Sequence, residues 1–555
     1  MQLLSATAFD QVRSELPFID PTDDPPDLRV LRSVDPQICL EHRVLPWRAY
    51  GERTVLLTPD PDRAAQKAPM LHAHFGDFSL AKTGPNAVES TIQEEFQSAL
   101  AHDAETALGH DMSCRGWNAD LAFRWFLGVV ICVLALIIVI PSVLFAIATG
   151  WVIIVLFCST ALKLGALLAT GSKQAPSGQD VASNDLPSFS LLVPLFKEKD
   201  IAEHLILHLN RLDYPKHLLD VCLIVESDDV GTIATLGSLS LPSWMRVITA
   251  PEGQLRTKPR ALNYALAFAR GSIIGVYDAE DAPEPGQLRT VAQTFAESDP
   301  SVACVQGNLD YYNAASNWLA RCFALEYASW FRVVLPGYAR LGLLVPLGGT
   351  TLFFRRDVLQ DLGAWDAHNV TEDADLGVRL ARKKFRTVFM QSVTLEEANA
   401  RVWPWIRQRS RWLKGYGVTY AVHMRAPLKL LKDLGIWRFF GFQILFLGTL
   451  SQFLTAPLLW SVIVIPFGLP HPILDLLGPM GFLLVTGFFL CSAAVNLAAS
   501  CLGAHRAGKP WLMKWAPTMV LYFPLATVGA LKGLAELLWK PFYWDKTAHG
   551  VDVPR

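Results

Sequence analysis

The sequence predicts an α/β domain with a doubly wound sheet, embedded in an α-helical transmembrane protein and preceded by a small α/β domain. Three observations predict this fold class. Between residues 186 and 400, short aliphatic runs alternate with helical stretches, which is typical of a parallel sheet covered by helices. Long uncharged apolar stretches flank this region. Residues 1–110 contain short apolar runs punctuated by proline and aspartate, as a small cytosolic regulatory or docking module would.

The composition favours a membrane protein with a reduced cytosolic face. Of 555 residues, 51% are hydrophobic and only 18% are charged, against about a quarter charged in soluble domains. The net charge of -2 offers no basic surface, so we exclude nucleic acid as a partner. The nine cysteines are scattered without a CxxC pair, which argues against a disulfide or zinc framework.

The first membrane segment is predicted at residues 121–170. No charged residue occurs in 125–162, which is nearly twice the roughly 20 residues that one helix needs to cross a bilayer. Two transmembrane helices joined near Pro141 or Gly150 fit best, and a signal anchor followed by a long buried helix is the alternative. Two crossings place residues 1–110 and the central domain in one compartment, the cytosol by the positive-inside rule.

The chain returns to the membrane after the central domain. Residues 401–437 are expected to form amphipathic helices at the membrane surface, and 439–538 to form transmembrane channel helices. The last apolar stretch, 511–538, contains two prolines, so a further span and a bent interfacial segment both remain open. Residues 540–555 are then a cytosolic tail.

Acidic clusters follow two of the predicted strands. Asp278, Glu280 and Asp281 come directly after an apolar run, and carboxylate oxygens suit a Mg²⁺ or Mn²⁺ ion that bridges a nucleotide diphosphate. One β-α unit earlier, Glu226 and Asp228 follow another apolar run and are candidates to accept hydrogen bonds from a base and ribose. A solvated turn explains either cluster alone, but the carboxyl ends of parallel strands collect ligands at one edge of a sheet.

Asp373 is the candidate general base. Thr371-Glu372-Asp373 begins a predicted helix, so an N-cap with acidic residues in the first turn is the structural alternative. As a catalytic pair, Asp373 with Glu372 beside it would remove a proton from an acceptor hydroxyl. Lys258 begins another predicted helix and is a candidate for phosphate contact or an ordinary surface lysine.

The stretch Gln408-Arg409-Ser410-Arg411-Trp412 is basic and aromatic. Arg411 suits bidentate contact with phosphate oxygens, and Trp412 offers a ring face for a sugar. Trp403 and Trp405 are expected beside Trp412 at the channel mouth, where ring stacking would suit a neutral glucan. A membrane-surface helix also explains this composition, and both interpretations can hold.

Taken in order, these motifs resemble the membrane-integrated, cellulose-synthase-like type of family 2 inverting glycosyltransferases. The resemblance spans roughly residues 120–550 and rests on 193–198, 226–229, 257–263, 278–281, 371–373 and 408–412. It implies the GT-A fold. The implied roles are nucleotide binding by Glu226 and Asp228, metal and diphosphate binding by Asp278, Glu280 and Asp281, substrate contact by Glu198 and Lys258, base catalysis by Asp373, and acceptor contact by Gln408, Arg411 and Trp412.

A finer similarity points to processive synthases, which extend a chain and pass it through their own helices. Residues 369–377 and 542–550 are similar to a bacterial subgroup that includes β-glucan synthases and a phage-adsorption inner-membrane protein. Residues 348–354 depart from that subgroup, which has a Ser-Asn-His run there, and this bears on the acceptor or the linkage. The tail resembles a gating loop that closes over the nucleotide, through Trp544, Lys546 and Thr547.

The N-terminal module resembles part of the N-terminal domain of type II secretion ATPases, through residues 17–20, 45–46 and 57–61. Some of those domains bind cyclic di-GMP through a repeated Arg-Leu-Gly motif, which this sequence lacks. The resemblance implies a regulatory or docking role, with cyclic di-GMP or a regulatory protein as the candidate partner.

The expected activity is that of a processive inverting glycosyltransferase in the bacterial inner membrane. Its donor would be a UDP-sugar, with UDP-glucose preferred to UDP-N-acetylglucosamine, and its acceptor a growing β-linked polysaccharide. A periplasmic or outer-membrane export partner would receive the product. The alternatives are a single-transfer enzyme acting on a lipid acceptor, against which the Gln-Arg-Ser-Arg-Trp motif argues, and a non-catalytic envelope scaffold, which has no need of the carboxylates.

Overall fold

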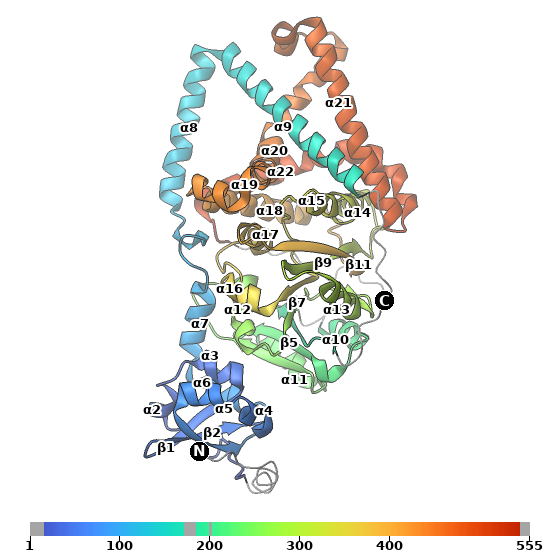
Figure 1. The fold of residues 1–555 in the computed structure, drawn as a ribbon. Helices are drawn as coiled ribbons and strands as arrows, with labels where there is room; N and C mark the ends of the chain where they lie inside the picture. Colours follow the sequence, from blue (N-terminus) through green and yellow to red (C-terminus); the bar gives the residue numbers. More distant parts are fainter. Residues whose placement is uncertain (1–15, 171–184, 199–201, 544–555) are drawn as a thin grey trace.

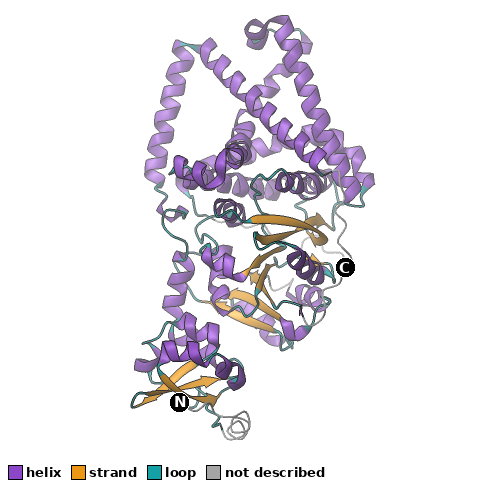
Figure 2. Cartoon of the chain, viewed as in Figure 1, coloured by secondary structure: helices purple, strands orange, loops and turns teal. Residues whose placement is uncertain are grey.

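The computed structural model describes residues 16–170, 185–198 and 202–543. A small N-terminal domain is followed by two long helices, a central α/β domain and a C-terminal group of helices (Figure 1). In this view the α/β domain lies between the N-terminal domain and the long helices. Figure 2 shows that strands are confined to the two α/β domains.

The N-terminal domain is a three-stranded sheet covered by short helices. Strand β1 pairs antiparallel with β2, and β2 pairs parallel with β3. Leu45, Leu57 and Val88 are fully buried in its core, and the small N-terminal α/β domain predicted from the sequence is confirmed. The elements are α2 (Leu28–Leu31), α3 (Pro36–His42), β1 (Leu45–Tyr50), β2 (Arg53–Thr58), α4 (Pro61–Gln66), α5 (Ala68–Phe75), β3 (Asp77–Lys82), α6 (Ala87–Glu95) and α7 (Gln97–Thr106).

The central domain is built on an eight-stranded sheet of order β6-β5-β4-β7-β10-β9-β11-β8. The four strands from β6 to β7 run parallel, as the alternation of strands and helices predicts. The strands are β4 (Phe189–Leu195), β5 (Leu219–Glu226), β6 (Met245–Ala250), β7 (Ile273–Val276), β8 (Ala282–Pro283), β9 (Val302–Tyr311), β10 (Leu352–Arg355) and β11 (Arg386–Glu396). Every residue of β5 and β9 is buried, which is typical of strands covered on both faces.

The other half of the sheet is mixed, which the sequence did not predict. Strand β10 runs antiparallel to both β7 and β9, whereas β11 is parallel to β9 and antiparallel to β8. Parallel neighbours need a crossover that returns the chain to the same edge. The chain instead enters β10 directly after the glycine pair at 348–349. The first residue of β10, Leu352, lies opposite Val276 at the end of β7. This arrangement brings the glycine pair to the edge where the parallel strands end.

Helices cover the sheet and carry several of the predicted site residues. Helix α12 begins at Lys258 with Pro259 in its first turn, a position where the missing proline N–H is no loss. The helices are α10 (Ala202–Asn210), α11 (Val230–Ser238), α12 (Lys258–Phe268), α13 (Gln287–Glu297), α14 (Trp318–Ser329), α15 (Leu335–Arg340), α16 (Arg356–Asp361) and α17 (Glu372–Arg382). Shorter segments are η1 (Cys114–Gly116), η3 (Lys216–Leu218) and the π-helical η4 (Trp330–Val334).

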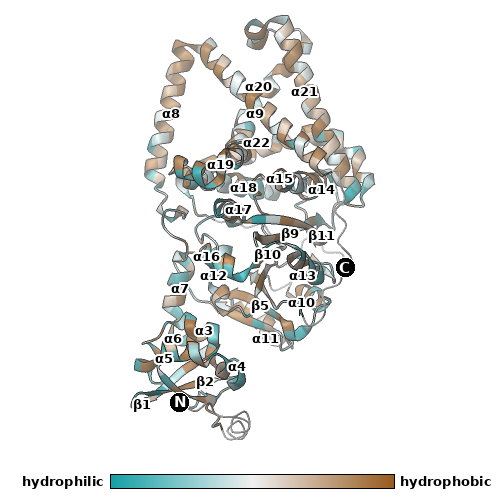
Figure 3. Cartoon of the chain, viewed as in Figure 1, coloured by the Kyte–Doolittle hydropathy of each residue, from teal (hydrophilic) through white to brown (hydrophobic). Residues whose placement is uncertain are grey.

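Within the described residues, five helical segments are long and apolar enough to cross a membrane. They are Ala119–Val139, Pro141–Ala169, Pro427–Phe467, Pro472–Arg506 and Pro510–Trp539, and apolar residues dominate α8, α9, α20 and α21 in Figure 3. The first two meet at Pro141, one of the two predicted turn positions. The elements are α8 (Ala119–Val139), α9 (Pro141–Ala169), α18 (Val402–His423), α19 (Pro427–Phe442), η5 (Gln443–Gly448), α20 (Thr449–Ser461), η6 (Val462–Phe467), α21 (Pro472–Arg506), η7 (Pro510–Thr518) and α22 (Met519–Trp539).

Candidate active site

The predicted site residues gather around one elongated cavity of about 1110 Å³. In the central domain the cavity lies where β4, β5 and β7 end, which is the edge at which parallel sheets bind ligands. The predicted residues that line it are Glu198, Glu226, Lys258, Asp278, Glu280, Glu372, Asp373, Gln408, Arg411 and Trp412. The structure therefore unites motifs that are far apart in the sequence.

Two predicted residues, Asp281 and Asp228, do not line the cavity. Asp281 is fully buried, and its carboxylate accepts hydrogen bonds from the backbone N–H of Asp278 at 2.8 Å and from the Thr350 hydroxyl. Asp281 thus shapes the turn that presents Asp278. Asp228 is exposed and forms an ion pair with Arg256, with 2.6 Å between Oδ2 and Nη1. The tail residues Trp544, Lys546 and Thr547 lie outside the described residues.

Asp278 and Glu280 are the two carboxylates of their cluster that reach the cavity. Lys258 Nζ forms an ion pair with Asp278 and donates a hydrogen bond to the Gly349 carbonyl at 2.7 Å. No group of three or more His, Cys, Asp or Glu side chains is arranged for a metal within the ranges that the structure describes. Mg²⁺ commonly binds through one or two carboxylates and completes its shell with substrate phosphate, so Asp278 and Glu280 fit such an ion.

Glu396 is a cavity carboxylate that the sequence did not predict. It ends β11, and Leu395 pairs with Ala282 of β8, which brings Glu396 beside the acidic turn at 278–281. Burial raises the pKa of Glu396, and Asp281 adds to the effect. Its buried Oε1 has no hydrogen-bond partner in the described part of the chain, which is consistent with a cation at this edge. Only the pairing of β11 with β8 reveals this residue, because a glutamate at a strand end carries no motif.

Asp373 lies in the first turn of α17, against the glycine pair. A Cβ on Gly349 would lie 3.4 Å from Asp373 Oδ2. Burial raises the pKa of Asp373 to about 6. Burial, followed by the neighbouring Asp373, raises the pKa of Glu372 to about 8. The pKa of Glu372 is raised further than that of Asp373, so Asp373 is the better candidate of the two for a base.

The chain before α17 is anchored on α18 instead of being capped. Thr371 occupies the N-cap position, but its side chain makes no capping hydrogen bond. It packs on Gly415, where a Cβ would lie 2.2 Å from Thr371 Oγ1, and Asn369 Nδ2 donates to Thr419 Oγ1 at 3.0 Å. Helix α18 thus fixes where Asp373 enters the cavity.

Four residues of the Gln-Arg-Ser-Arg-Trp motif line the cavity, and one of them also holds α18 in place. The lining residues are Gln408, Arg409, Arg411 and Trp412. The Arg409 guanidinium donates to Glu326 of α14 at 2.8 and 2.6 Å and lies 4.7 Å from the Trp412 ring centroid. Bidentate geometry of this kind fixes orientation as well as distance, so Arg409 orients the helix that presents Trp412.

The expectation that three tryptophans surround the channel mouth is wrong for two of them. Trp403 is exposed, and Trp405 is buried with its ring N–H donating to the Tyr522 hydroxyl at 2.9 Å. Neither lines the cavity. Trp405 shares a helix face with Trp412, since the two are two turns apart, but Tyr522 of α22 covers it.

The cavity continues from the central domain into the membrane segments. Thr160 of α9 donates to Ser492 of α21 at 2.9 Å, and Lys163 donates to Asn496 at 2.5 Å. Helices α9, α20, α21 and α22 all contribute to the lining, with the polar side chains Ser159, Thr160, Lys163, Gln452, Ser492 and Asn496 and the aromatic side chains Phe453, Trp460, Phe489 and Phe523. Polar side chains in a membrane segment normally face such an interior.

A protein-family model matches part of each α/β domain. Residues 187–415 match the family described as Glycosyltransferase like family 2, and residues 14–72 match the MshEN domain. The chain is 28% identical over 234 residues to a probable glycosyltransferase, YdaM, of Bacillus subtilis, covering 42% of this chain and 56% of that protein. It is 26% identical over 311 residues to a beta-monoglucosyldiacylglycerol synthase of Synechocystis sp., covering 53% of this chain and 63% of that protein.

The chain thus spans between half and two thirds of the length of these relatives. Among solved structures, a mannosyltransferase of Pyrobaculum calidifontis in complex with GDP-Man and Mn²⁺ is similar with a TM-score of 0.44 and 18% identity, covering 70% of this chain and 99% of that one. The family match spans the strands that carry the cavity carboxylates. Residues 187–415 of the central domain are therefore similar to family 2 glycosyltransferases, and residues 14–72 of the N-terminal domain are similar to the MshEN domain.

Proposed function

We propose that this protein is a processive inverting glycosyltransferase that polymerises a UDP-sugar, with UDP-glucose as the preferred donor, into a β-linked polysaccharide. The observation that carries the proposal is the single cavity that joins the carboxylates of the central domain to the polar and aromatic side chains of four membrane helices. A chain that grows beside Asp373 would enter the membrane part of this cavity without leaving the protein. Hydroxyl groups would bond to its polar side chains and sugar rings would stack on its aromatic ones.

The proposed reaction assigns one task to each cluster. Glu226 and Asp228 hold the nucleotide, and Asp278 with Glu280 holds a Mg²⁺ or Mn²⁺ ion, which when bound offsets the charge of the leaving diphosphate. Asp373 takes the proton of the acceptor hydroxyl as the acceptor oxygen bonds to the anomeric carbon from the face opposite the diphosphate. The bond from that carbon to the diphosphate breaks, UDP leaves with the bonding electrons, and the configuration inverts.

The proposal places the protein in the bacterial inner membrane with its catalytic domain in the cytosol. The MshEN domain is then a cytosolic module for a regulatory partner, with cyclic di-GMP as the candidate ligand. A periplasmic or outer-membrane export partner would take up the emerging chain. The gating role of Trp544, Lys546 and Thr547 remains part of this proposal.

A second candidate is a single transfer to a lipid acceptor. The similarity to a beta-monoglucosyldiacylglycerol synthase favours it, since a lipid could enter the same cavity between the membrane helices. Product size separates the two, because a lipid acceptor would receive one sugar and a processive enzyme would release a long chain.

The test is to size the product that the purified protein makes from radiolabelled UDP-glucose or UDP-N-acetylglucosamine with Mn²⁺. We expect long chains from the natural protein and chains shortened about fivefold in Trp412→Ala, because loss of an aromatic stacking partner costs about 1 kcal/mol per contact. Trp403→Ala is the matched control, since Trp403 is exposed and off the cavity. A single added sugar in every variant would replace the processive proposal with the lipid one.

The rate of transfer should rise with pH through about 6. Burial raises the pKa of Asp373 to about 6, and only the ionised form accepts a proton, so activity is lost as pH falls below that value. The measurement is kcat/KM between about pH 5 and pH 8, with UDP binding followed over the same range as the control. An acid limb at the pKa of an ordinary aspartate, near 4, would contradict the assignment of Asp373 as a buried base.

A further inference from the structure

One buried arginine joins the N-terminal part of the chain to a carboxylate of the cavity. Arg260 of α12 is fully buried. Its Nε donates to Glu105 Oε1 of α7 at 2.9 Å, and its Nη1 donates to Glu226 Oε2 at 3.3 Å. Its Nη2 donates to the Pro251 carbonyl at 2.6 Å. Glu226 lines the cavity, so one guanidinium connects α7 with the proposed nucleotide site.

Glu105 also holds the loop between β6 and α12. Its Oε1 accepts a hydrogen bond from the backbone N–H of Gln254 at 3.0 Å. A Cβ on Gly253 would lie 2.3 Å from Glu105 Oε1, so the loop closes tightly on this carboxylate. Arg256, two residues after Gln254, forms the ion pair with Asp228. The loop that Glu105 fixes therefore also carries the arginine that holds the second proposed nucleotide carboxylate.

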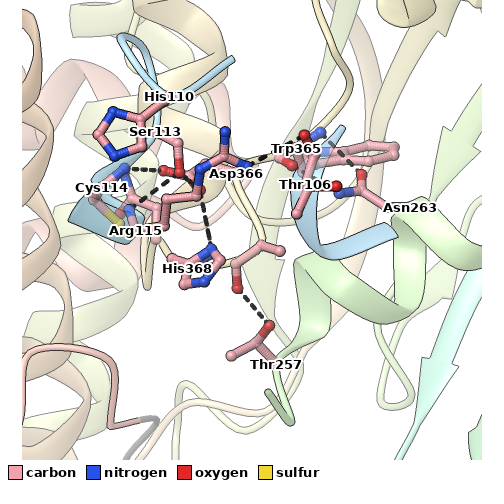
Figure 4. Close-up of polar contacts among 12 residues, drawn as sticks. Thr106, His110, Ser113, Cys114, Arg115, Thr257, Asn263, Trp365, Asp366 and His368 are labelled. Carbon is pink, nitrogen blue, oxygen red and sulfur yellow. Dashed lines mark hydrogen bonds and ion pairs between the residues drawn. The ribbon is translucent and has the colours of Figure 1, made fainter. Parts of the chain in front are cut away.

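The side chain of Asn263 attaches α12 to the end of α7. Its Nδ2 donates to the Ala104 carbonyl at 2.9 Å and to the Trp365 carbonyl at 2.8 Å. Its Oδ1 accepts from the Trp365 N–H at 3.0 Å. Figure 4 shows Asn263 and Trp365 beside Thr106, which ends α7. These bonds place Glu105, between Ala104 and Thr106, directly over α12.

The segment after α7 makes a second attachment (Figure 4). The Ser113 hydroxyl and the Cys114 N–H donate to the buried carboxylate of Asp366 at 2.8 and 2.7 Å. The neighbouring Ala367 carbonyl accepts from the Thr257 hydroxyl at 2.7 Å. Both ends of the 104–114 segment are therefore fixed to parts of the chain that border the cavity, which leaves little freedom for Glu105.

We propose that Glu105 is a positioning residue of the donor site, which orients Arg260 so that Arg260 holds Glu226 in the geometry that binds the nucleotide. This inference rests on the proposed function, because it assigns nucleotide binding to Glu226. The planar guanidinium fork fixes direction as well as distance, and a buried arginine requires its partners because an unpaired buried charge is costly. A movement of the N-terminal domain that displaces α7 therefore changes donor affinity through Arg260.

Glu105→Gln tests the proposal through the kinetics of the full-length protein. Gln keeps the size and the acceptor oxygen but removes the charge that orients Arg260. We expect KM for UDP-glucose to rise about fivefold, equivalent to about 1 kcal/mol, with kcat within about twofold. The affinity for UDP, measured by calorimetric titration in Mn²⁺, should fall by the same factor. Glu105→Asp, which keeps the charge, should recover part of the affinity.

Glu89→Gln is the matched control. Glu89 pairs with Arg270 at 2.8 Å and Arg43 at 3.3 Å, so it joins the same two domains, yet it does not line the cavity. The UDP affinity of the Glu89→Gln variant should equal that of the natural protein. If Glu89→Gln weakens UDP binding as much as Glu105→Gln does, domain docking explains the effect and the proposal is overturned.

The remaining outcomes separate the inference from the proposed function. Failure of the natural protein to bind UDP would overturn the nucleotide assignment of Glu226, and the role of Glu105 with it. Normal UDP binding by both the natural protein and Glu105→Gln would overturn the role of Glu105 alone. If thermal melting shows that Glu105→Gln is not folded, Arg260→Lys is tested instead. This variant keeps the positive charge and removes the guanidinium fork. Unchanged KM in that variant would equally overturn the proposal.

Discussion

Asp373→Asn is expected to reduce sugar transfer by about 10²–10⁴-fold, the usual contribution of a general base, and to leave UDP binding nearly unchanged. Asparagine preserves the shape of the side chain and can still accept the 2.8 Å hydrogen bond from the Ala374 N–H. It cannot take a proton from the acceptor hydroxyl. The loss should therefore appear in kcat, measured as sugar incorporated per minute at saturating donor.

Asp361→Asn provides the control for this prediction, since Asp361 is exposed at the end of α16. It should retain the full rate and the natural melting temperature. Activity within about threefold of the natural rate in Asp373→Asn would exclude Asp373 as the base. Glu372 would then be the next carboxylate to test, because it lines the same cavity.

Asp278→Asn is expected to lower transfer by about 10²–10³-fold and to raise the Mn²⁺ concentration needed for half-maximal rate. The substitution removes a charged oxygen from a proposed metal site that has few carboxylates, and the ion supplies several kcal/mol of charge stabilisation in such reactions. It also releases Lys258 from its ion pair with Asp278. The measurement is the initial rate as a function of Mn²⁺ concentration at fixed donor.

Chelation separates the metal contribution from that of Lys258. Removal of divalent ions should abolish transfer by the natural protein and should also abolish the residual rate of Asp278→Asn. Full activity of the natural protein in excess EDTA would show that Asp278 serves only to hold Lys258, and the metal assignment would fail. Asp361→Asn again serves as the control and should follow the natural Mn²⁺ curve.

The parallel half of the sheet and its carboxylates could be predicted because the information is local. An apolar run followed at once by Glu226, or by Asp278, indicates both a buried strand and what stands at its end. The paired membrane helices were equally predictable, since bilayer thickness sets the length of an apolar stretch. The antiparallel course of β10 was not, because strand direction depends on how the chain enters the sheet.

The places of individual residues within the motifs were not predictable, for a different reason. Asp281 belongs to the same acidic run as Asp278. Asp278 reaches the cavity, whereas Asp281 is buried against Thr350 and shapes the turn, and only the tertiary structure shows this difference. Trp405 and Trp412 share a helix face, and only Tyr522 of α22 decides which ring stays open. In each case the neighbour that decides the role is distant in the sequence.

The sequence by itself determined the kinds of side chain in this protein and their local setting: strand-end carboxylates, carboxylates in the first turn of a helix, a basic aromatic helix and apolar segments of membrane length. Each of these features depends on residues that are close together in the sequence, so periodicity and spacing are enough to predict it. Only the tertiary structure brought Glu396 to the acidic turn, continued the cavity into four membrane helices and set Glu105 against Arg260, 155 residues further along the chain. Such contacts depend on strand order and helix packing, which a single sequence does not encode in any local pattern.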